Sequence, residues 1–373
     1  MTLPLLTSTT IRSTKLANRL ALAPMSRTSA DKDGTPTQAM ADYYASFARG
    51  GFGMLIVEAT FIDQSYSQSY AGQPGLVSDA HEAAWRRVVD AVKRENGVIV
   101  LQLMHAGATS QCTFETHAPS PVRPRGTMIQ GYGPRQGSYD VPKELSRDQI
   151  QGIREAFLQA VQRAERAGFD GVEIHCANGY LLDQFLTEET NQRTDDYGGT
   201  LENRLRLTSE IISAAKAATS PEFLTGVRLS QAKATEQDYF WPNGLQDAEA
   251  IFSGVSAAGS DYIHLASEKS GYAYHCSTRK GENLTEFARK LTGLPVIANG
   301  GLEDIDLSNG LISSGKADIL SIGKAAMLNP DLPQKISSGQ PPRPFTFDMF
   351  RYGVTIDAQR KWEAEIGDLM AST

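Results

Sequence analysis

The chain has few cysteines, and the three that it has, Cys112, Cys176 and Cys276, lie far apart among its 373 residues. They follow no spacing that is typical of metal ligands, so we predict no metal site. A protein-bound iron–sulfur cluster would need about four thiolates, which excludes such a centre. An odd number of scattered thiols fits a reducing compartment, and we therefore expect a cytoplasmic protein.

The chain also lacks a long apolar run and an excess of basic residues. No apolar segment approaches the ~18 residues of a membrane span, and the N-terminus lacks a basic start followed by an apolar run of signal length. The formal net charge is −7, from 36 basic and 43 acidic residues. We therefore predict neither a nucleic-acid nor a membrane partner and expect a small-molecule substrate. A monomer and a homodimer are both compatible with the sequence.

A third absence is the dinucleotide fingerprint, a glycine-rich turn that directly follows a strand. The glycines of residues 49–53 precede an apolar run instead of following one. Those of residues 131–133 lie in a Pro- and Gly-rich segment with no strand before it. A nicotinamide nucleotide would therefore bind without a Rossmann domain.

What the chain does contain is a regular alternation of short apolar runs with amphipathic helical patterns, which predicts parallel βαβ units. The eight runs are residues 20–23, 53–57, 98–101, 171–174, 224–229, 262–265, 295–298 and 319–322. Nearly every run is followed by small or polar residues such as Glu58, Gln102 and His175, which would converge at the C-terminal face of a barrel. We predict one α/β domain over residues 1–373, a (β/α)₈ TIM barrel, in preference to an open doubly wound sheet.

Residues 106–142, a second long loop of residues 230–244, and the C-terminal tail fall outside this rhythm. Residues 106–142, after the third strand, are rich in Pro, Gly and Tyr, and a segment of this length predicts an ordered capping insertion. A disordered insertion is the alternative. The C-terminal tail, residues 340–373, would order either against a neighbouring subunit or against its own barrel.

Three polar side chains occur within six positions at the end of the fourth run. His175, Asn178 and Tyr180 follow a short apolar strand, and Asn178-Gly179 is a strong turn signal. The turn would bring an imidazole, a carboxamide and a phenol together. His and Asn can hold a carbonyl oxygen that gains negative charge while Tyr donates a proton. The alternative is a helix N-terminus with capping polar groups.

Glycines follow the last two predicted strands. Gly300 and Gly301 follow the seventh run, and Gly323 and Lys324 follow the eighth, where barrels commonly bind phosphate. Backbone N–H groups at glycines can approach an anion closely, and a lysine adds positive charge. We predict a phosphate site, with two glycine turns and a surface lysine as the alternative.

Arg228 shares one face of its strand with Gly226. An arginine that points into a barrel cannot lose its proton and needs an anion. That anion is either Glu58 or Glu173, or a ligand that carries or develops negative charge, as a reduced flavin does. Gln102, which can both donate and accept hydrogen bonds, would suit the pyrimidine-like edge of such a ring.

With these residues together, the chain resembles the Old Yellow Enzyme family of FMN-dependent ene-reductases. The resemblance extends from about residue 18 to about residue 333. Its most specific motif is RTDDYGGTLENR at residues 193–204, and further matching motifs are residues 18–27, 102–107, 227–230 and 317–330.

The resemblance implies a TIM barrel that binds FMN and uses NADPH or NADH as hydride donor. It implies reduction of activated C=C bonds, those of α,β-unsaturated carbonyl or nitro compounds, by a ping-pong mechanism. His175 and Asn178 would hold the substrate oxygen, and Tyr180 would be the proton donor. The implied ring contacts are Pro24, Met25, Ser26, Ala59, Gln102 and Arg228, and the implied phosphate contacts are Gly300, Gly301, Gly323 and Lys324.

The sequence departs from the family's pattern at four positions. Ser26 stands where Thr or Cys is usual, Lys324 where Arg is usual, and Ala108 where many members carry Arg. Met104 occupies a position that is Trp in some relatives. These departures bear on flavin potential and substrate range, because none removes a group that the reaction requires.

Two other functions fit parts of the pattern. A flavin-free, phosphate-binding barrel enzyme of the aldolase or isomerase type would need a catalytic lysine or an acid–base pair inside the barrel, and Lys324 is the evident candidate. A low-turnover flavin- or ligand-binding sensor would not need the complete set of His175, Asn178 and Tyr180.

Overall fold

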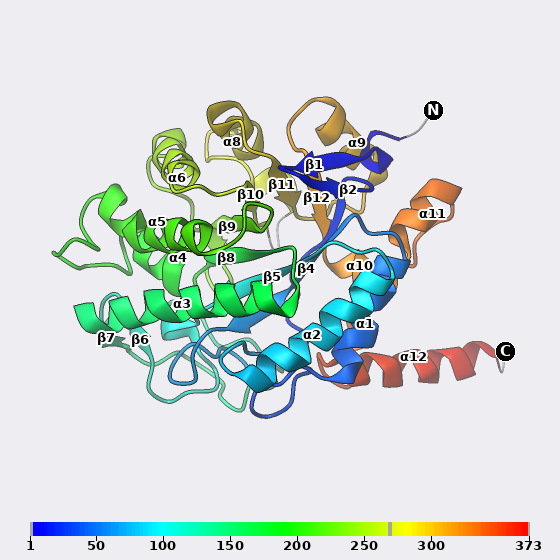
Figure 1. Ribbon diagram of the computed structural model, residues 1–373, viewed down its shortest axis with the longest axis horizontal. Coiled ribbons are helices and arrows are strands. Elements are labelled where there is room, and N and C mark those ends of the chain that lie inside the picture. The colour runs from blue at the N-terminus through cyan, green and yellow to red at the C-terminus, as the bar shows by residue number, and fades with distance from the viewer. Residues whose placement is uncertain (1–2, 268–270, 372–373) are drawn as a thin grey trace.

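The computed structural model describes residues 3–267 and 271–371, and its central feature is a closed barrel of eight parallel strands (Figure 1). The barrel order is β10-β11-β12-β3-β4-β5-β8-β9. The strands are β3 Leu20–Leu22, β4 Met54–Phe61, β5 Ile99–Met104, β8 Gly171–Asn178, β9 Leu224–Lys233, β10 Tyr262–Leu265, β11 Val296–Asn299 and β12 Ile319–Ile322. Each apolar run forms one barrel strand, so the predicted (β/α)₈ fold is confirmed.

Glu58, Gln102 and His175 directly follow their apolar runs but do not follow their strands. They lie inside β4, β5 and β8, whose hydrogen-bonded pairing continues beyond the apolar run. An apolar run ends where side chains stop facing the hydrophobic core, whereas a strand ends where its backbone pairing ends. The two limits differ at the mouth of a barrel, because polar side chains there face a cavity.

Side chains fill the barrel near the amino ends of its strands. Gly226 makes room for Tyr262 there, because a Cβ on Gly226 would lie 2.0 Å from the tyrosine ring. The hairpin of β1 Thr9–Ile11 and β2 Thr14–Leu16, which the sequence analysis did not predict, packs its apolar residues into the same cluster. The cluster contains Ile11, Leu16, Ala21, Met54, Ile56, Val100, Leu224, Tyr262, Ile297 and Ile319. This end of the barrel is therefore closed by packed side chains.

Helices cover the outside of the barrel (Figure 1). They are α1 Gln38–Arg49, α2 Asp79–Arg94, α3 Arg147–Ala167, α4 Leu181–Leu186, α5 Leu201–Ala218, α6 Leu245–Ala257, α7 Tyr272–His275, α8 Leu284–Thr292, α9 Ile305–Ser313, α10 Lys324–Leu328, α11 Leu332–Ser338 and α12 Ile356–Ala371. Short 3₁₀ helices are η1 Pro4–Leu6, η2 Gly107–Thr109 and η3 Phe347–Phe350. α3 begins with a capping box in which Ser146 Oγ accepts from the Gln149 N–H at 3.2 Å and Gln149 Oε1 accepts from the Ser146 N–H at 2.9 Å.

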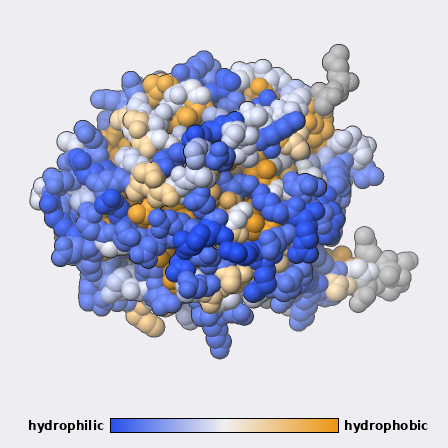
Figure 2. All heavy atoms as spheres, in the orientation of Figure 1, coloured by the Kyte–Doolittle hydropathy of each residue, from blue (hydrophilic) through white to orange (hydrophobic). Residues whose placement is uncertain are grey.

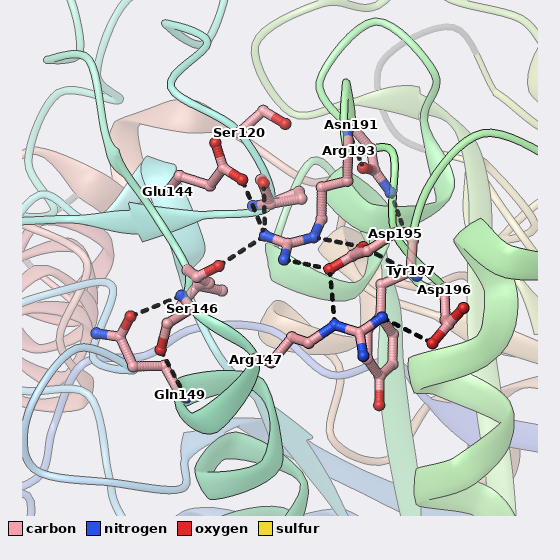
Figure 3. A network of polar contacts seen from close by, with 12 residues as sticks. Ser120, Glu144, Ser146, Arg147, Gln149, Asn191, Arg193, Asp195, Asp196 and Tyr197 are labelled. Atoms are coloured by element: carbon pink, nitrogen blue, oxygen red, sulfur yellow. Dashed lines mark hydrogen bonds and ion pairs between the residues drawn. The ribbon is translucent and has the colours of Figure 1, made fainter.

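The segment of residues 106–142 is tied to the barrel by the motif most specific to the resembled family. Arg193 donates to Pro119 O at 3.2 Å and to Leu145 O at 2.6 Å, the residues that directly follow the short parallel strands β6 His117–Ala118 and β7 Lys143–Glu144. Its guanidinium also pairs with Asp195 at 2.6 Å (Figure 3). Arg193 of this motif therefore joins Pro119, within the segment, to Leu145, just after it. A capping role for residues 106–142 stays a prediction.

The C-terminal tail packs against its own barrel. Arg27, which is buried, donates to Val354 O at 3.1 Å and to Gln359 Oε1 at 2.7 Å. In Figure 1, α12 runs beside α1 at the lower right. Val354 and Gln359 of the tail are therefore held by Arg27 of the same chain.

The face of the molecule in Figure 2 is mostly hydrophilic, with apolar residues in small scattered groups. No helix in the described part of the chain combines the length and the apolar character needed to cross a membrane. Within residues 3–267 and 271–371, no three His, Cys, Asp or Glu side chains are grouped as metal ligands.

Candidate active site

A cavity of 540 Å³ lies at the carboxyl ends of the barrel strands. Its wall contains every residue to which the sequence analysis assigned a site role, namely Pro24, Met25, Ser26, Ala59, Gln102, His175, Asn178, Tyr180, Arg228, Gly300, Gly301, Gly323 and Lys324. The barrel therefore brings together residues from both ends of the chain. The individual role of each residue stays a prediction.

The end of β8 places the three polar side chains of the central motif. Asn178 closes the strand with a φ of +61°, and Gly179 follows with a φ of +84°. The Asn178 N–H donates to Ser230 Oγ at 2.8 Å, which fixes the turn against β9. Tyr180 is the N-cap residue of α4 but makes no side-chain capping bond. The alternative that these residues serve as helix caps is therefore wrong for Tyr180.

His175 is held neutral by its surroundings. The imidazole is buried and its ring centroid lies 5.0 Å from that of Tyr180. Burial, together with the positive charges of Arg228 and His264, lowers the pKa of His175 well below its usual value. Its Nδ1 atom is buried and has no hydrogen-bond partner among the described residues. A neutral imidazole at the cavity wall can bond a ligand without bringing a charge.

Tyr180 forms a hydrogen bond with a second phenol that the sequence analysis missed. The hydroxyl oxygens of Tyr70 and Tyr180 lie 2.6 Å apart, and both side chains are buried. Burial and the neighbouring Tyr180 raise the pKa of Tyr70 well above its usual value. Tyr70 lies in the loop after β4, where no periodic pattern marks a residue as part of a site. The Tyr70 hydroxyl can accept a hydrogen bond from Tyr180 while Tyr180 keeps its proton. It can instead donate one to the Tyr180 oxygen when that oxygen is negative.

Arg228 lies inside the barrel at the cavity wall and is almost fully buried. The alternative partner Glu173 does contribute, because Arg228 acts electrostatically on this carboxylate. Burial alone would raise the pKa of Glu173, but His264, Arg228 and a hydrogen bond from Gln102 lower it below its usual value. Glu58, the other alternative, instead accepts the N–H groups of the segment after β3.

Gln102 has its carboxamide fixed by the same acid. Its Nε2 donates to Glu173 Oε1 at 2.7 Å, and Glu173 also accepts from Tyr262 at 3.2 Å. The carbonyl oxygen of Gln102 is therefore the part of the amide turned away from Glu173. The carbonyl oxygen of Gln102, an acceptor, and the Arg228 cation therefore belong to the wall of the same cavity.

The glycines after β11 form an open backbone surface. Gly300 and Gly301 have φ values of +114° and +66°, which side chains rarely tolerate. A Cβ on Gly300 would lie 2.7 Å from Ser267 Cβ, whereas a Cβ on Gly301 would meet no atom within 4 Å. Lys324 begins α10 beside them, with its Nζ 5.6 Å from the Phe347 ring centroid. Backbone N–H groups at glycines together with a cation suit an anionic group.

The model of one protein family covers most of the chain. The NADH:flavin oxidoreductase / NADH oxidase family model matches residues 4–342. The chain belongs to this family.

Individual relatives agree with this assignment. The chain is 34% identical over 351 residues to putative 12-oxophytodienoate reductase 2 of Oryza sativa subsp. japonica, covering 91% of this chain and 88% of the relative. It is 33% identical over 345 residues to a probable flavin mononucleotide-dependent alkene reductase of Leishmania infantum, with coverages of 89% and 90%. The solved old yellow enzyme homologue from Zymomonas mobilis matches with a TM-score of 0.83 and 30% identity over 93% of this chain and 96% of that chain.

The protein is therefore an FMN-dependent NAD(P)H oxidoreductase of the ene-reductase type. This assignment replaces the two alternatives, a flavin-free aldolase or isomerase and a low-turnover sensor. It also agrees with the resemblance to the Old Yellow Enzyme family that the sequence motifs carry.

The cavity of this family member fits FMN at both ends of the cofactor. The glycine backbone with Lys324 matches a phosphate, because a ligand atom can fill the space that a Cβ of Gly301 would enter. Gln102 and Arg228, on another part of the wall, match a ring edge that both donates and accepts hydrogen bonds. The departure at Lys324 leaves a cation in place but removes the two-pronged geometry of an arginine.

Met104, the last of the four departures named above, does not line the cavity. It is fully buried and belongs to an apolar cluster with Ala59, Tyr70 and Tyr180. Met104 therefore packs in the same cluster as Tyr70 and Tyr180 without reaching the cavity. Asn299, which directly precedes the glycines of the predicted phosphate site, also lines the cavity, as does Ser321, to which the sequence analysis assigned no role. Polar residues in otherwise apolar strands could have indicated from the sequence that these two side chains face a cavity.

Glu58 fixes the segment that carries Pro24, Met25 and Ser26. Its Oε2 accepts from the Arg27 N–H at 2.8 Å and the Thr28 N–H at 3.1 Å, and its Oε1 accepts from Tyr44 at 3.1 Å. Burial raises the pKa of Glu58 from 4.5 to about 7, although these donors and Arg27 oppose the shift. The carboxyl therefore titrates near neutral pH.

A measurable pH dependence of stability follows for Glu58. The folded protein binds more protons than the unfolded chain between pH 4.5 and about 7. Below pH 4.5 the protonated Glu58 contributes its full share, roughly 3 kcal/mol, to the free energy of unfolding. This contribution is lost as the pH rises through about 7. We expect Glu58→Gln, which keeps an acceptor, to gain stability relative to wild type between about pH 5 and about pH 8. Thermal midpoints with excess FMN would measure this, and parallel pH curves would contradict it.

Proposed function

We propose that His175, Asn178 and Tyr180 act on an activated alkene inside the cavity that also holds FMN. The observation that carries this proposal is that one cavity wall contains these three residues, Arg228 and the glycine surface. An α,β-unsaturated carbonyl or nitro compound suits the site, because its oxygen needs donors and its carbon needs a proton. The names of the alkene reductase and oxophytodienoate reductase relatives support the same substrate class.

His175 and Asn178 bind the activating oxygen of the substrate. A neutral imidazole N–H and a carboxamide N–H are donors that strengthen as the oxygen gains negative charge. Because neither donor carries a charge, the two residues bind the oxygen by hydrogen bonds and do not form an ion pair with it. The two residues therefore orient the alkene and polarise it.

Tyr180 donates the proton to the substrate carbon next to the activating group. Its hydrogen bond with Tyr70, at 2.6 Å, stabilises the phenol oxygen when the proton leaves. Both tyrosine side chains are largely buried, which limits the access of water to this oxygen. The protein thereby controls where the proton is added.

FMN, when bound, would supply the hydride chemistry that couples oxidation of NAD(P)H to reduction of the alkene. Gly300, Gly301, Gly323 and Lys324 hold its phosphate in this proposal. Pro24, Met25, Ser26, Ala59, Gln102 and Arg228 hold its ring. Since all these residues border the same cavity as His175 and Asn178, the nicotinamide and the alkene occupy it in turn, which is the ping-pong order.

A titration with a phenol tests the oxygen-binding role directly. A phenolate or phenol oxygen can take the place of the substrate oxygen while its ring stacks on the flavin, and the complex is followed by its visible absorption. We expect His175→Ala and Asn178→Ala each to raise the dissociation constant by about tenfold or more, the loss expected for a buried hydrogen bond to a charged oxygen. Ser213→Ala, on the outer face of α5, serves as a control with unchanged affinity. If both variants bound phenol as tightly as the wild type, His175 and Asn178 would not be the residues that bind the substrate oxygen.

A further inference from the structure

A buried ion pair lies directly behind the turn that carries Asn178 and Tyr180. Lys233 Nζ donates to Asp183 Oδ1 at 2.6 Å, with 9% of the lysine side chain and 0% of the aspartate side chain exposed. Lys233 ends β9, and Asp183 lies in α4. Neither lines the large cavity, and both line a smaller cavity of 90 Å³ on the other side of the turn. The pair therefore contacts no substrate in the large cavity.

The ion pair is bonded to the turn itself. Asp183 Oδ2, the oxygen not used by Lys233, accepts the Gly179 N–H at 2.7 Å. Asn178 and Lys233 are register partners where β8 and β9 end, and the Ala234 N–H donates to Asn178 O at 3.0 Å. A single charged pair thus joins the end of β8, the first turn of α4 and the end of β9.

The turn needs such restraint because its backbone conformation is unfavourable. Asn178 has a φ of +61°, in the left-handed region that non-glycine residues seldom adopt. Lys233 also packs tightly here, because a Cβ on Gly179 would lie 3.3 Å from Lys233 Cβ. A reacting group displaced by about 1 Å can lose about 100-fold in rate. Small movements of this turn would therefore affect the reaction.

Stability alone does not account for the pair. Removing two charges from water costs about as much as their attraction returns, so apolar side chains of similar size would fill this space equally well. Apolar side chains, however, cannot keep an oxygen aimed at the Gly179 N–H. The Lys233 ammonium also lies 4.5 Å from the Tyr239 ring centroid, which fixes it from a second side.

We propose that Lys233 is a positioning residue of the alkene half-reaction: it orients the Asp183 carboxylate, which holds Gly179 and thereby sets the positions of Asn178 and Tyr180. This inference rests on the roles proposed above for Asn178 and Tyr180. It adds a residue that touches neither the substrate nor the cofactor.

Lys233→Met tests the proposal, because it keeps the length of the side chain and removes the ammonium. In the FMN-loaded protein, we expect reoxidation by 2-cyclohexenone to slow by about tenfold or more and phenol to bind about tenfold more weakly. Bleaching of the flavin by NADPH should fall clearly less than reoxidation, since that step takes no proton from Tyr180, although the nicotinamide enters the cavity that Asn178 borders. Lys233→Arg keeps the charge and should recover most of the reoxidation rate. Rapid mixing without oxygen measures both half-reactions.

Lys216→Met is the matched control. Lys216 pairs with the buried Asp261 at 2.8 Å, but Asp261 precedes β10 at the closed end of the barrel. We expect this variant to lose thermal stability while keeping both half-reactions and the phenol affinity. If Lys233→Met does not fold, Asp183→Asn/Lys233→Met, which leaves no buried charge, replaces it under the same criteria.

Two kinds of result would overturn the proposal. One is a Lys233→Met protein whose reoxidation rate and phenol affinity equal those of wild type. The other is an equal loss in both half-reactions, or the same losses in Lys216→Met, which would mean a general effect on folding. Either result leaves the proposed function intact if His175→Ala still weakens phenol binding, whereas an unaffected His175→Ala would overturn the proposed function itself.

Discussion

Replacing Tyr180 by Phe is expected to slow reoxidation of the reduced enzyme by an enone by about 100- to 10,000-fold, the range contributed by a positioned general acid. The variant loses only the hydroxyl that hydrogen-bonds to Tyr70, and the ring remains to pack against His175. Bleaching by NADPH should change little, because no proton from this residue enters that step. Rapid mixing of each half-reaction separates the two effects.

Tyr197→Phe is a suitable control for the loss of a buried tyrosine hydroxyl. Tyr197 lies outside the barrel, where its hydroxyl contacts Gln151 at 2.7 Å and Glu210 at 3.1 Å. We expect this variant to be less stable and unchanged in both half-reactions. A Tyr180→Phe enzyme that reoxidises at the wild-type rate would show that the proton comes from another group, and Tyr70 would be the first to examine.

The second large effect is expected for Arg228→Gln, and it should fall on the opposite half-reaction. Arg228 is the buried cation at the cavity wall beside Gln102. It favours a ligand that gains negative charge on reduction, so its removal should lower the midpoint potential of bound FMN and weaken FMN binding. We expect bleaching by NADPH to slow by about 100- to 1,000-fold, as when one preorganised electrostatic contact is removed.

The electrostatic surroundings of Arg228 sharpen this test. Glu173, whose pKa His264, Arg228 and Gln102 lower, keeps its bonds to His264, Gln102 and Tyr262 in this variant, so Arg228→Gln removes one positive charge from the cavity wall and leaves the neighbouring carboxyl in place. Arg289→Gln, which removes an arginine paired with Asp318 on the protein surface, is the control and should leave the potential unchanged. A midpoint potential equal to that of wild type in Arg228→Gln would contradict an electrostatic role for this residue.

Much of the active site was predictable because barrel geometry converts positions along the chain into positions in space. Each parallel strand carries its carboxyl end to the same face, so Gln102, His175 and Arg228 meet although they lie on three strands. The glycines after β11 and β12 could be assigned for the same reason. The limits of the strands were less predictable, because apolar patterning reports burial in the core and not backbone pairing.

Tyr70 and the aromatic residues of the tail show where sequence reasoning stops. Tyr70 lies in a loop, and Phe345 and Phe350 lie near η3, yet all three line the cavity. Loops have no periodic pattern that reports which side chain points inward. Their positions depend on contacts with distant segments, as when Arg27 fixes the tail through Val354 and Gln359.

The sequence by itself determined the barrel, its eight strands and the residues that meet at its mouth, because strand and helix periodicity are local properties and a closed parallel barrel orders its strand ends. Only the tertiary structure decided which side chains support those residues. The contacts between Tyr70 and Tyr180, between Glu173 and Gln102, and between Lys233 and Asp183 join segments far apart in the chain. Such contacts depend on the packing of whole elements at distances of a few ångströms, and no local pattern encodes them.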